Sequence, residues 1–173
     1  PDLFSWRFWY PRQRRFRRVL YTRSKLQGTG KMPVPKYIGI ISKWVTEPSA
    51  IRFAEVAESY YGYPTEYYED IKALASSLTV IYSGVEMGQI FKGKLKPEWP
   101  LSQSVWYNKG VMPAVEVDRE TALDYLRKKD ITAAQFEEGI NLVTSDGYPL
   151  GFVKRIGNRV NNTYPNSLKI NNL

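Results

Sequence analysis

The spacing of apolar residues predicts short helices and strands through most of the chain. In KYIGIISKWV, Ile38, Ile41 and Trp44 recur at helical intervals, whereas IRFAEVAESYYGY reads as a strand or hairpin. Thr65 is the expected N-cap of the next helix. The apolar face of that helix would comprise Tyr67, Tyr68, Ile71, Leu74, Ala75 and Leu78. The run LTVIYSGV is then predicted to form a buried strand.

A new pattern begins after Pro97 and Pro100, so a domain boundary is placed near Leu101. LSQSVWYN is predicted to be a short helix and AVEV a strand, and Asp118 is the expected N-cap of the helix that follows. The apolar runs 140–143 and 150–153 flank the turn signal Ser145-Asp146-Gly147. This arrangement predicts a β-hairpin.

These elements predict an α+β protein made of two small domains. Residues 35–101 would form a compact α/β domain and residues 102–173 a β-rich one, preceded by a basic, aromatic-rich segment at residues 1–34. About 70 residues is near the lower limit for an independent core, so we expect the two domains to share an interface. Trp99 and Trp106, close to the boundary, are expected to fill it.

The net charge of +8 predicts an anionic partner, and its distribution matters more than its size. Residues 1–36 hold ten Lys or Arg against one acid, whereas the remaining residues hold fifteen bases and sixteen acids. The segment 1–34 is interpreted either as a basic arm for RNA phosphates or as a flexible or partly docked tail. Lys92, Lys94 and Lys96 would share one face of a strand, as a charged edge or as a phosphate track.

Several classes of chemistry lack the residues that they need. The sequence contains no cysteine and no histidine, which excludes thiolate nucleophiles, thiolate metal sites and histidine general bases. Neither a phosphate-binding loop nor a dinucleotide-binding glycine motif is complete, and we expect no metal site. No apolar run approaches the roughly 20 residues that span a bilayer, so the chain is expected to be cytoplasmic with no membrane partner.

The C-terminal end combines cations, amides and a tyrosine within a short stretch. The residues predicted to bind RNA are Lys154, Arg155, Asn158, Arg159, Asn161, Asn162 and Tyr164. The cations would contact phosphates, and the asparagines would contact base edges or ribose hydroxyls. The tyrosine would either stack on a base or pack beneath the loop. The alternative interpretation of the same residues is a surface turn with solvated charges.

Three motifs resemble one family. DGYPLGFVKRIGNRVNNTYPNSLKI resembles the closing motif of the PUA-like domain in the RsmF-type, Sun-family rRNA 5-methylcytosine methyltransferases of bacteria. EVDRETALDYLRK resembles the strand-to-helix entry of that domain, and SLTVIYSGVEMGQIFKGKLKPEW resembles the end of the domain before it. The likeness covers residues 35–173 and is fainter before them.

The resemblance implies that residues 102–173 form a PUA-like β-barrel that binds rRNA. Segment 1–34 would be a remnant of the methyltransferase domain, and the absence of an initiating Met agrees with a fragment. In that family S-adenosylmethionine is the cofactor and a cysteine attacks the base, so this cysteine-free chain is expected to bind no cofactor and not to be catalytic alone. Its expected function is to position substrate rRNA for a catalytic methyltransferase domain or chain. The alternative is a structural or adaptor module that binds a protein partner.

Overall fold

The structure, a computed structural model, describes residues 34–80 and 82–171, so the predicted basic segment lies outside the described residues except for Val34. The elements of the first half are α1 (Pro35–Ile41), η1 (Ser42–Trp44), η2 (Pro48–Ala50), β1 (Ile51–Val56), β2 (Ser59–Pro64), η3 (Thr65–Tyr67), α2 (Tyr68–Ser77), β3 (Val85–Phe91) and β4 (Lys94–Pro97). Those of the second half are α3 (Trp99–Ser102), β5 (Ala114–Glu116), α4 (Arg119–Leu126), η4 (Ala133–Gln135), β6 (Gly139–Ser145), β7 (Tyr148–Ile156), β8 (Arg159–Asn162) and η5 (Asn166–Leu168). Helices and strands are mixed, as expected for an α+β protein.

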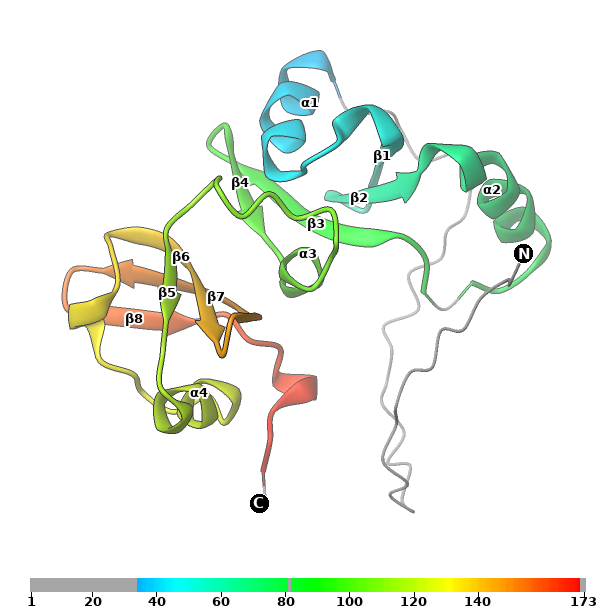
Figure 1. Cartoon of the computed structure of the whole chain (residues 1–173). Coiled ribbons are helices and arrows are strands. Elements are labelled where there is room, and N and C mark those ends of the chain that lie inside the picture. Colours follow the sequence, from blue (N-terminus) through cyan, green and yellow to red (C-terminus); the bar gives the residue numbers. More distant parts are fainter. Residues whose placement is uncertain (1–33, 81, 172–173) are drawn as a thin grey trace.

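Strands β1 to β4 form an antiparallel sheet in chain order (Figure 1). The expected hairpin is present, because β1 and β2 pair from Ile51 opposite Pro64 to Val56 opposite Ser59. Gly88 lies inside β3 with φ +128. A Cβ at this position would collide with the backbone carbonyl oxygen of Lys96 in β4, so glycine permits the close approach of the two strands.

The second sheet has the order β5-β6-β7-β8, with β5 parallel to β6 and the other pairs antiparallel. The predicted hairpin is confirmed: Asp146 and Gly147, with φ +51 and +77, form the turn between β6 and β7. Both residues need left-handed backbone, which Asp-Gly pairs supply at such turns. The sheet is open at β5 and β8, so within the described residues the expected closed barrel is not found.

Helix α4 begins at the predicted cap. The side-chain Oδ1 of Asp118 accepts a hydrogen bond of 2.7 Å from the N–H of Thr121, which satisfies one of the otherwise unpaired amides of the first turn. Hydrogen bonding also lowers the pKa of the Asp118 carboxyl group. None of the helices in the described ranges has the length and apolar character needed to cross a bilayer.

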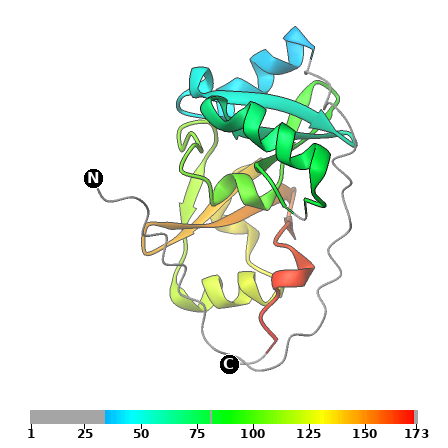
Figure 2. The same ribbon diagram turned by 90° about the vertical axis from the view of Figure 1, so that its right-hand side faces the viewer.

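Two apolar clusters form the core, and one of them joins the two sheets. The joining cluster packs Ile41, Val45, Ile51, Phe53, Tyr60, Met87, Leu95, Leu101 and Tyr107 against Leu142 and Phe152 of the second sheet. A second cluster lies under α4 and contains Val117, Ala122, Tyr125, Phe136, Val143, Val153 and Tyr164. Trp106 packs on the first cluster and Trp99 on the second. In Figure 2 the first half, blue to green, accordingly stands directly on the second, yellow to red.

The structure corrects the expected strand LTVIYSGV. The strand begins only at Val85, and Leu78 and Tyr82 before it are exposed. Strands β2 and β4 pair only with residues 85–91 of this region, among the residues that the structure describes. The apolar composition of the run predicted a strand. A strand also needs a partner strand, and no pattern within the run specifies one.

Two smaller expectations fail for local reasons. Thr65 makes no side-chain cap, because a 3-10 turn over Thr65–Tyr67 precedes α2. Lys92 does not share a strand face with Lys94 and Lys96, because it occupies the β3–β4 turn with φ +50.

Candidate nucleic-acid interface

The β7–β8 hairpin carries most of the residues predicted to bind RNA, and its register sorts them onto two faces. Lys154 pairs with Asn161, and Ile156 with Arg159. Directly paired residues of antiparallel strands point to the same side, and so do alternate residues of one strand. Lys154, Arg159 and Asn161 therefore share one face. Lys154 and Arg159 are exposed and Asn161 is half-buried.

That face continues into the apolar contact with the first half. Phe152, two residues before Lys154, lies edge-on to Trp44 at 6.5 Å between ring centroids and to Tyr107 at 5.8 Å. Ile140, paired directly with Lys154, also packs on the joining cluster. Lys154 thus lies at the margin of a buried contact, and the neighbouring backbone is fixed because Phe152 and Ile140 pack on the joining cluster.

The predicted RNA-binding residues do not include Lys43 of the first half or Lys109 of the segment before β5, which lie in the same region. Lys43 and Lys109 are exposed, and each lies within two positions of a residue that packs on Phe152. They are brought together because Asn108 donates from Nδ2 to the carbonyl oxygen of Lys43 at 3.0 Å, and its backbone N–H donates to that of Trp44. No local motif could have linked segments so far apart in the chain.

Arg155 lies on the opposite face and is used to hold the β7–β8 turn. Its guanidinium donates to the carbonyl oxygen of Gly157 at 2.8 Å and to that of Phe136. The N–H of Gly157 in turn donates to the Glu138 carboxylate at 3.0 Å. These bonds fix the turn from which the exposed Asn158 projects. The guanidinium of Arg155 therefore has a structural role in this hairpin.

Asn162 and Tyr164 also belong to the scaffold. Asn162 donates from Nδ2 to the carbonyl oxygen of Tyr125 at 2.7 Å and accepts from the N–H of Tyr164 at 2.9 Å. Tyr164 is buried, with its ring edge-on to Tyr125 at 5.4 Å and to Trp99 at 6.0 Å. Burial raises the pKa of the Tyr164 hydroxyl. Of the two interpretations of this tyrosine, packing describes the observed geometry.

The buried Asn141 holds the loop that supports the same turn. Its Oδ1 accepts from the N–H of Glu137 at 2.9 Å, and its Nδ2 donates to the carbonyl oxygens of Glu137 and Gly139. A fully buried amide with all of these bonds made rigidifies the loop that carries Glu138. The described residues contain no group of acidic side chains that could hold a metal ion.

Comparison with known proteins defines this part of the chain. Residues 112–170, from just before β5 to just after η5, match the family model described as the methyltransferase RsmF PUA domain. The C-terminal part of the chain is therefore a PUA domain of the RsmF type, which confirms the resemblance seen in its closing motif.

A curated relative agrees with this assignment. Over 58 residues the chain is 43% identical to the protein named ribosomal RNA small subunit methyltransferase F of Klebsiella pneumoniae (strain 342). The matched stretch covers 32% of this chain and 12% of that protein. The chain therefore aligns with only a small share of the relative's length.

Proposed function

We propose that this chain binds RNA through its C-terminal PUA domain and positions substrate rRNA for an S-adenosylmethionine-dependent 5-methylcytosine methyltransferase. The observation that carries the proposal is the match of residues 112–170 to the RsmF PUA domain. The exposed Lys154 and Arg159 on one face of that domain support it, because cations at fixed positions bind the phosphate backbone.

The division of labour within the proposal follows from the residues. With no cysteine, the chain has no thiolate to add to a cytosine ring. We therefore assign methyl transfer and S-adenosylmethionine binding to a catalytic methyltransferase domain or chain. Residues 35–101 and 102–173 would act as two small domains, with the second as the PUA-like unit.

The test measures how the affinity for a single-stranded oligonucleotide of small-subunit rRNA depends on salt. Each phosphate contact on a single strand contributes roughly 0.7 to the slope of log affinity against log salt, so the double variant Lys154→Ala/Arg159→Ala should flatten the slope by about 1.4. Lys72→Ala/Lys129→Ala removes the same charge from α2 and from the end of α4, and should leave the slope unchanged. An unaltered slope in the first variant would refute the assignment of these two cations.

A second function, binding of a catalytic methyltransferase domain or chain, is favoured by the surface of α2. Leu74 of α2 is 55% exposed and Leu78, the extended residue directly after the helix, is 61% exposed, although the sequence predicted both to belong to its apolar face. A contiguous exposed apolar patch is typical of protein contact surfaces. Leu74→Ser/Leu78→Ser should abolish co-purification with a separately expressed methyltransferase domain and leave RNA binding intact.

A further inference from the structure

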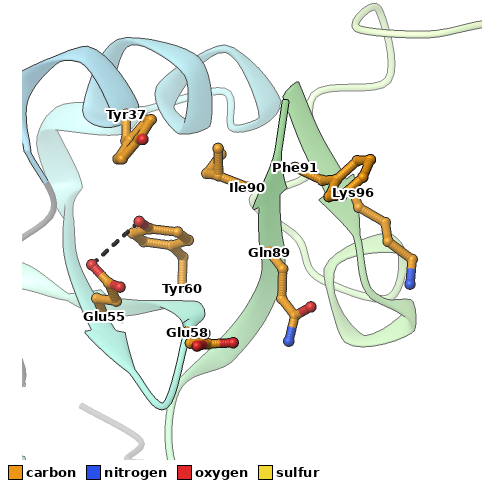
Figure 3. A pocket seen from close by; sticks show the side chains of 8 residues that line it. All are labelled: Tyr37, Glu55, Glu58, Tyr60, Gln89, Ile90, Phe91 and Lys96. Atoms are coloured by element: carbon orange, nitrogen blue, oxygen red, sulfur yellow. Dashed lines mark hydrogen bonds between the residues drawn. The ribbon is translucent and has the colours of Figure 1, made fainter. Parts of the chain in front are cut away.

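An open pocket of about 440 Å³ lies in the first half, outside the residues that match the PUA domain. It is lined by Tyr37, Glu55, Glu58, Tyr60, Gln89, Ile90, Phe91 and Lys96 (Figure 3). Its volume falls in the range of sites for small organic groups and accommodates a single nucleotide. The proposed RNA contacts of the β7–β8 hairpin do not use it.

Two tyrosines form one wall of the pocket. The rings of Tyr37 and Tyr60 meet edge to face with centroids 6.3 Å apart, and Figure 3 shows both on the side opposite Phe91. Tyr60 is 4% exposed, so it is fixed, whereas Tyr37 is half-buried and presents part of its ring. The ammonium of Lys36 lies 4.7 Å from the centroid of the Tyr37 ring. The ammonium of Lys36 covers one face of the Tyr37 ring, so only the other face is open to a ligand.

The polar groups of the pocket include both acceptors and donors. Tyr60 donates its hydroxyl hydrogen to Oε2 of Glu55 at 3.2 Å, and within the described residues Oε1 of Glu55 and both oxygens of Glu58 accept no hydrogen bond. Gln89 donates from Nε2 to Oγ of Ser59 at 3.3 Å, which uses one of its two amide hydrogens. Carboxylate oxygens can therefore receive hydrogens from a ligand, and the second amide hydrogen can be given to it.

Glu58 is held at the pocket by an unfavourable turn. Ala57 and Glu58 both have left-handed backbone, with φ +49 and +69, at positions where tight hairpins normally use Asn and Gly. A side chain in this conformation costs about 1–2 kcal/mol. A carboxylate therefore occupies a turn position where glycine would be favoured.

We infer that this pocket binds an unpaired guanine base of the RNA. Guanine presents two adjacent donors, N1–H and the N2 amino group, which a carboxylate can accept together, and acceptors at O6 and N7 for the Gln89 amide. The base ring would stack on the face of Tyr37 that Lys36 does not cover, and Lys36 and Lys96 would contact the flanking phosphates. The inference rests on the proposed RNA-binding function and places a second contact in the other half of the molecule.

The mixture of groups argues against a cationic side chain as the occupant. An arginine or lysine carries only donors, so it would complement the glutamates but leave the second amide hydrogen of Gln89 without an acceptor and place a cation near Lys96. A cytosine offers a single amino group with a neighbouring acceptor, which engages one carboxylate oxygen instead of two. Guanine satisfies the donors and the acceptors of the pocket at once.

The test titrates the full chain with guanosine 5′-monophosphate and inosine 5′-monophosphate, followed by NMR of the Gln89 side-chain amide. Inosine lacks only the N2 amino group, so it should bind at least about tenfold more weakly, as expected for the loss of a hydrogen bond to a charged acceptor. Glu58→Gln should reduce the affinity for the guanosine nucleotide by a similar factor and remove the discrimination. Glu66→Gln, the same change at an exposed position of η3, should do neither.

Equal affinity for the two nucleotides, or an unaffected Glu58→Gln variant, would overturn the inference. A synthetic peptide with the sequence of residues 13–25 tests the cationic alternative, since it holds several arginines. If the peptide binds in a manner that depends on Glu58 and the nucleotide does not bind, the pocket is a cation site and the inference is wrong. The nucleotide titration reports on the pocket and the salt series reports on RNA binding, so failure of one is distinguishable from failure of the other.

Discussion

Glutamates have different surroundings at the two four-stranded sheets. At the second sheet the carboxylates of Glu138 and Glu116 accept hydrogen bonds from the N–H groups of Gly157 and Gly147 and thereby fix turns. At the first sheet Glu58 and one edge of Glu55 face an open pocket. Residue type alone therefore does not distinguish a side chain that faces a pocket from a supporting one. Strand register and the position of the nearest backbone hydrogen-bonding group do.

The hairpin turns of the two sheets also differ, in this case in backbone strain. The second sheet uses Asp146-Gly147 and Gly157 where the backbone is left-handed, so its hairpins form with little strain. The first sheet places Ala57 and Glu58 in that conformation. We interpret the second sheet as optimised for rigidity and the β1–β2 turn of the first as retained for its side chain.

The largest expected effect concerns the contact between Gly151 and Trp99, where α3 meets the second sheet. A Cβ on Gly151 would collide with the Tyr125 hydroxyl and lie 2.8 Å from Cδ1 of Trp99, in a residue with φ +147. Gly151→Ala should therefore lower the free energy of unfolding by about 3–4 kcal/mol, because overpacking and backbone strain both contribute. Chemical denaturation followed by tryptophan fluorescence measures the loss.

Gly139→Ala is the matched control for that variant. Gly139 also has left-handed backbone, with φ +102, but a Cβ there meets no atom within 4 Å. Only strain applies, so the expected loss is about 1–2 kcal/mol. Equal losses in the two variants would show that the Trp99 contact does not join α3 to the sheet as described.

Raising the pH above about 10 should lower the free energy of unfolding, because Tyr107 of the joining cluster ionises more easily in the unfolded chain. Burial raises the pKa of Tyr107 to about 12, whereas an unfolded tyrosine titrates near about 10. Between these values the unfolded chain has lost the proton and the folded chain has kept it, so stability falls as the pH rises. The slope is roughly 1.4 kcal/mol per pH unit for this group.

The measurement compares the wild type with Tyr107→Phe by denaturation at several pH values. The variant cannot ionise at this position, so its free energy of unfolding should fall less steeply, by about 2–3 kcal/mol across the interval from pH 10 to 12. Parallel curves for the two proteins would mean that Tyr107 is accessible to water in the folded state.

Two neighbouring asparagines distinguish the scaffold from the proposed binding surface. Asn162 makes two hydrogen bonds to backbone groups, so Asn162→Ala should lower the free energy of unfolding by about 2 kcal/mol. Asn161 is on the opposite face, paired with Lys154, and Asn161→Ala should change stability by less than about 0.5 kcal/mol. RNA affinity should respond in the reverse order when measured well below the unfolding transition. An Asn162→Ala variant of unchanged stability would contradict the structural role.

Much of the second sheet could be predicted because the residues that determine its turn and its helix cap are adjacent in sequence. The Ser145-Asp146-Gly147 turn and the Asp118 cap are set by residues adjacent in sequence, and both are confirmed. The start of β3 and the role of Gly88 depend instead on partner strands that no local pattern identifies. The closed barrel was expected from the family resemblance, and the strand patterns could not test that expectation because they do not show how the sheet edges pair.

The candidate sites show the same limit. The sequence placed seven interacting residues in one stretch, and strand alternation alone could have divided Lys154, Asn161 and Arg159 from the others. What it could not reveal is that Arg155 meets the carbonyl oxygen of Phe136 across a loop. The pocket was missed altogether, since its lining extends from Tyr37 to Lys96 through four strands and a helix.

The smallest expected effect tests the contrast between the turns directly. Glu58→Gly places glycine where the backbone is left-handed, so it should raise the free energy of unfolding by about 1 kcal/mol while removing the carboxylate from the pocket. Gly147→Ala, at the equivalent position of the second sheet with φ +77 and open space around it, should lower stability by a similar amount. Thermal and chemical denaturation of the two variants measure both signs. If Glu58→Gly stabilises the chain and also abolishes binding of the guanosine nucleotide, the strained turn serves binding. If Glu58→Gly destabilises the chain, Glu58 makes a structural contact, and the two turns do not differ in strain.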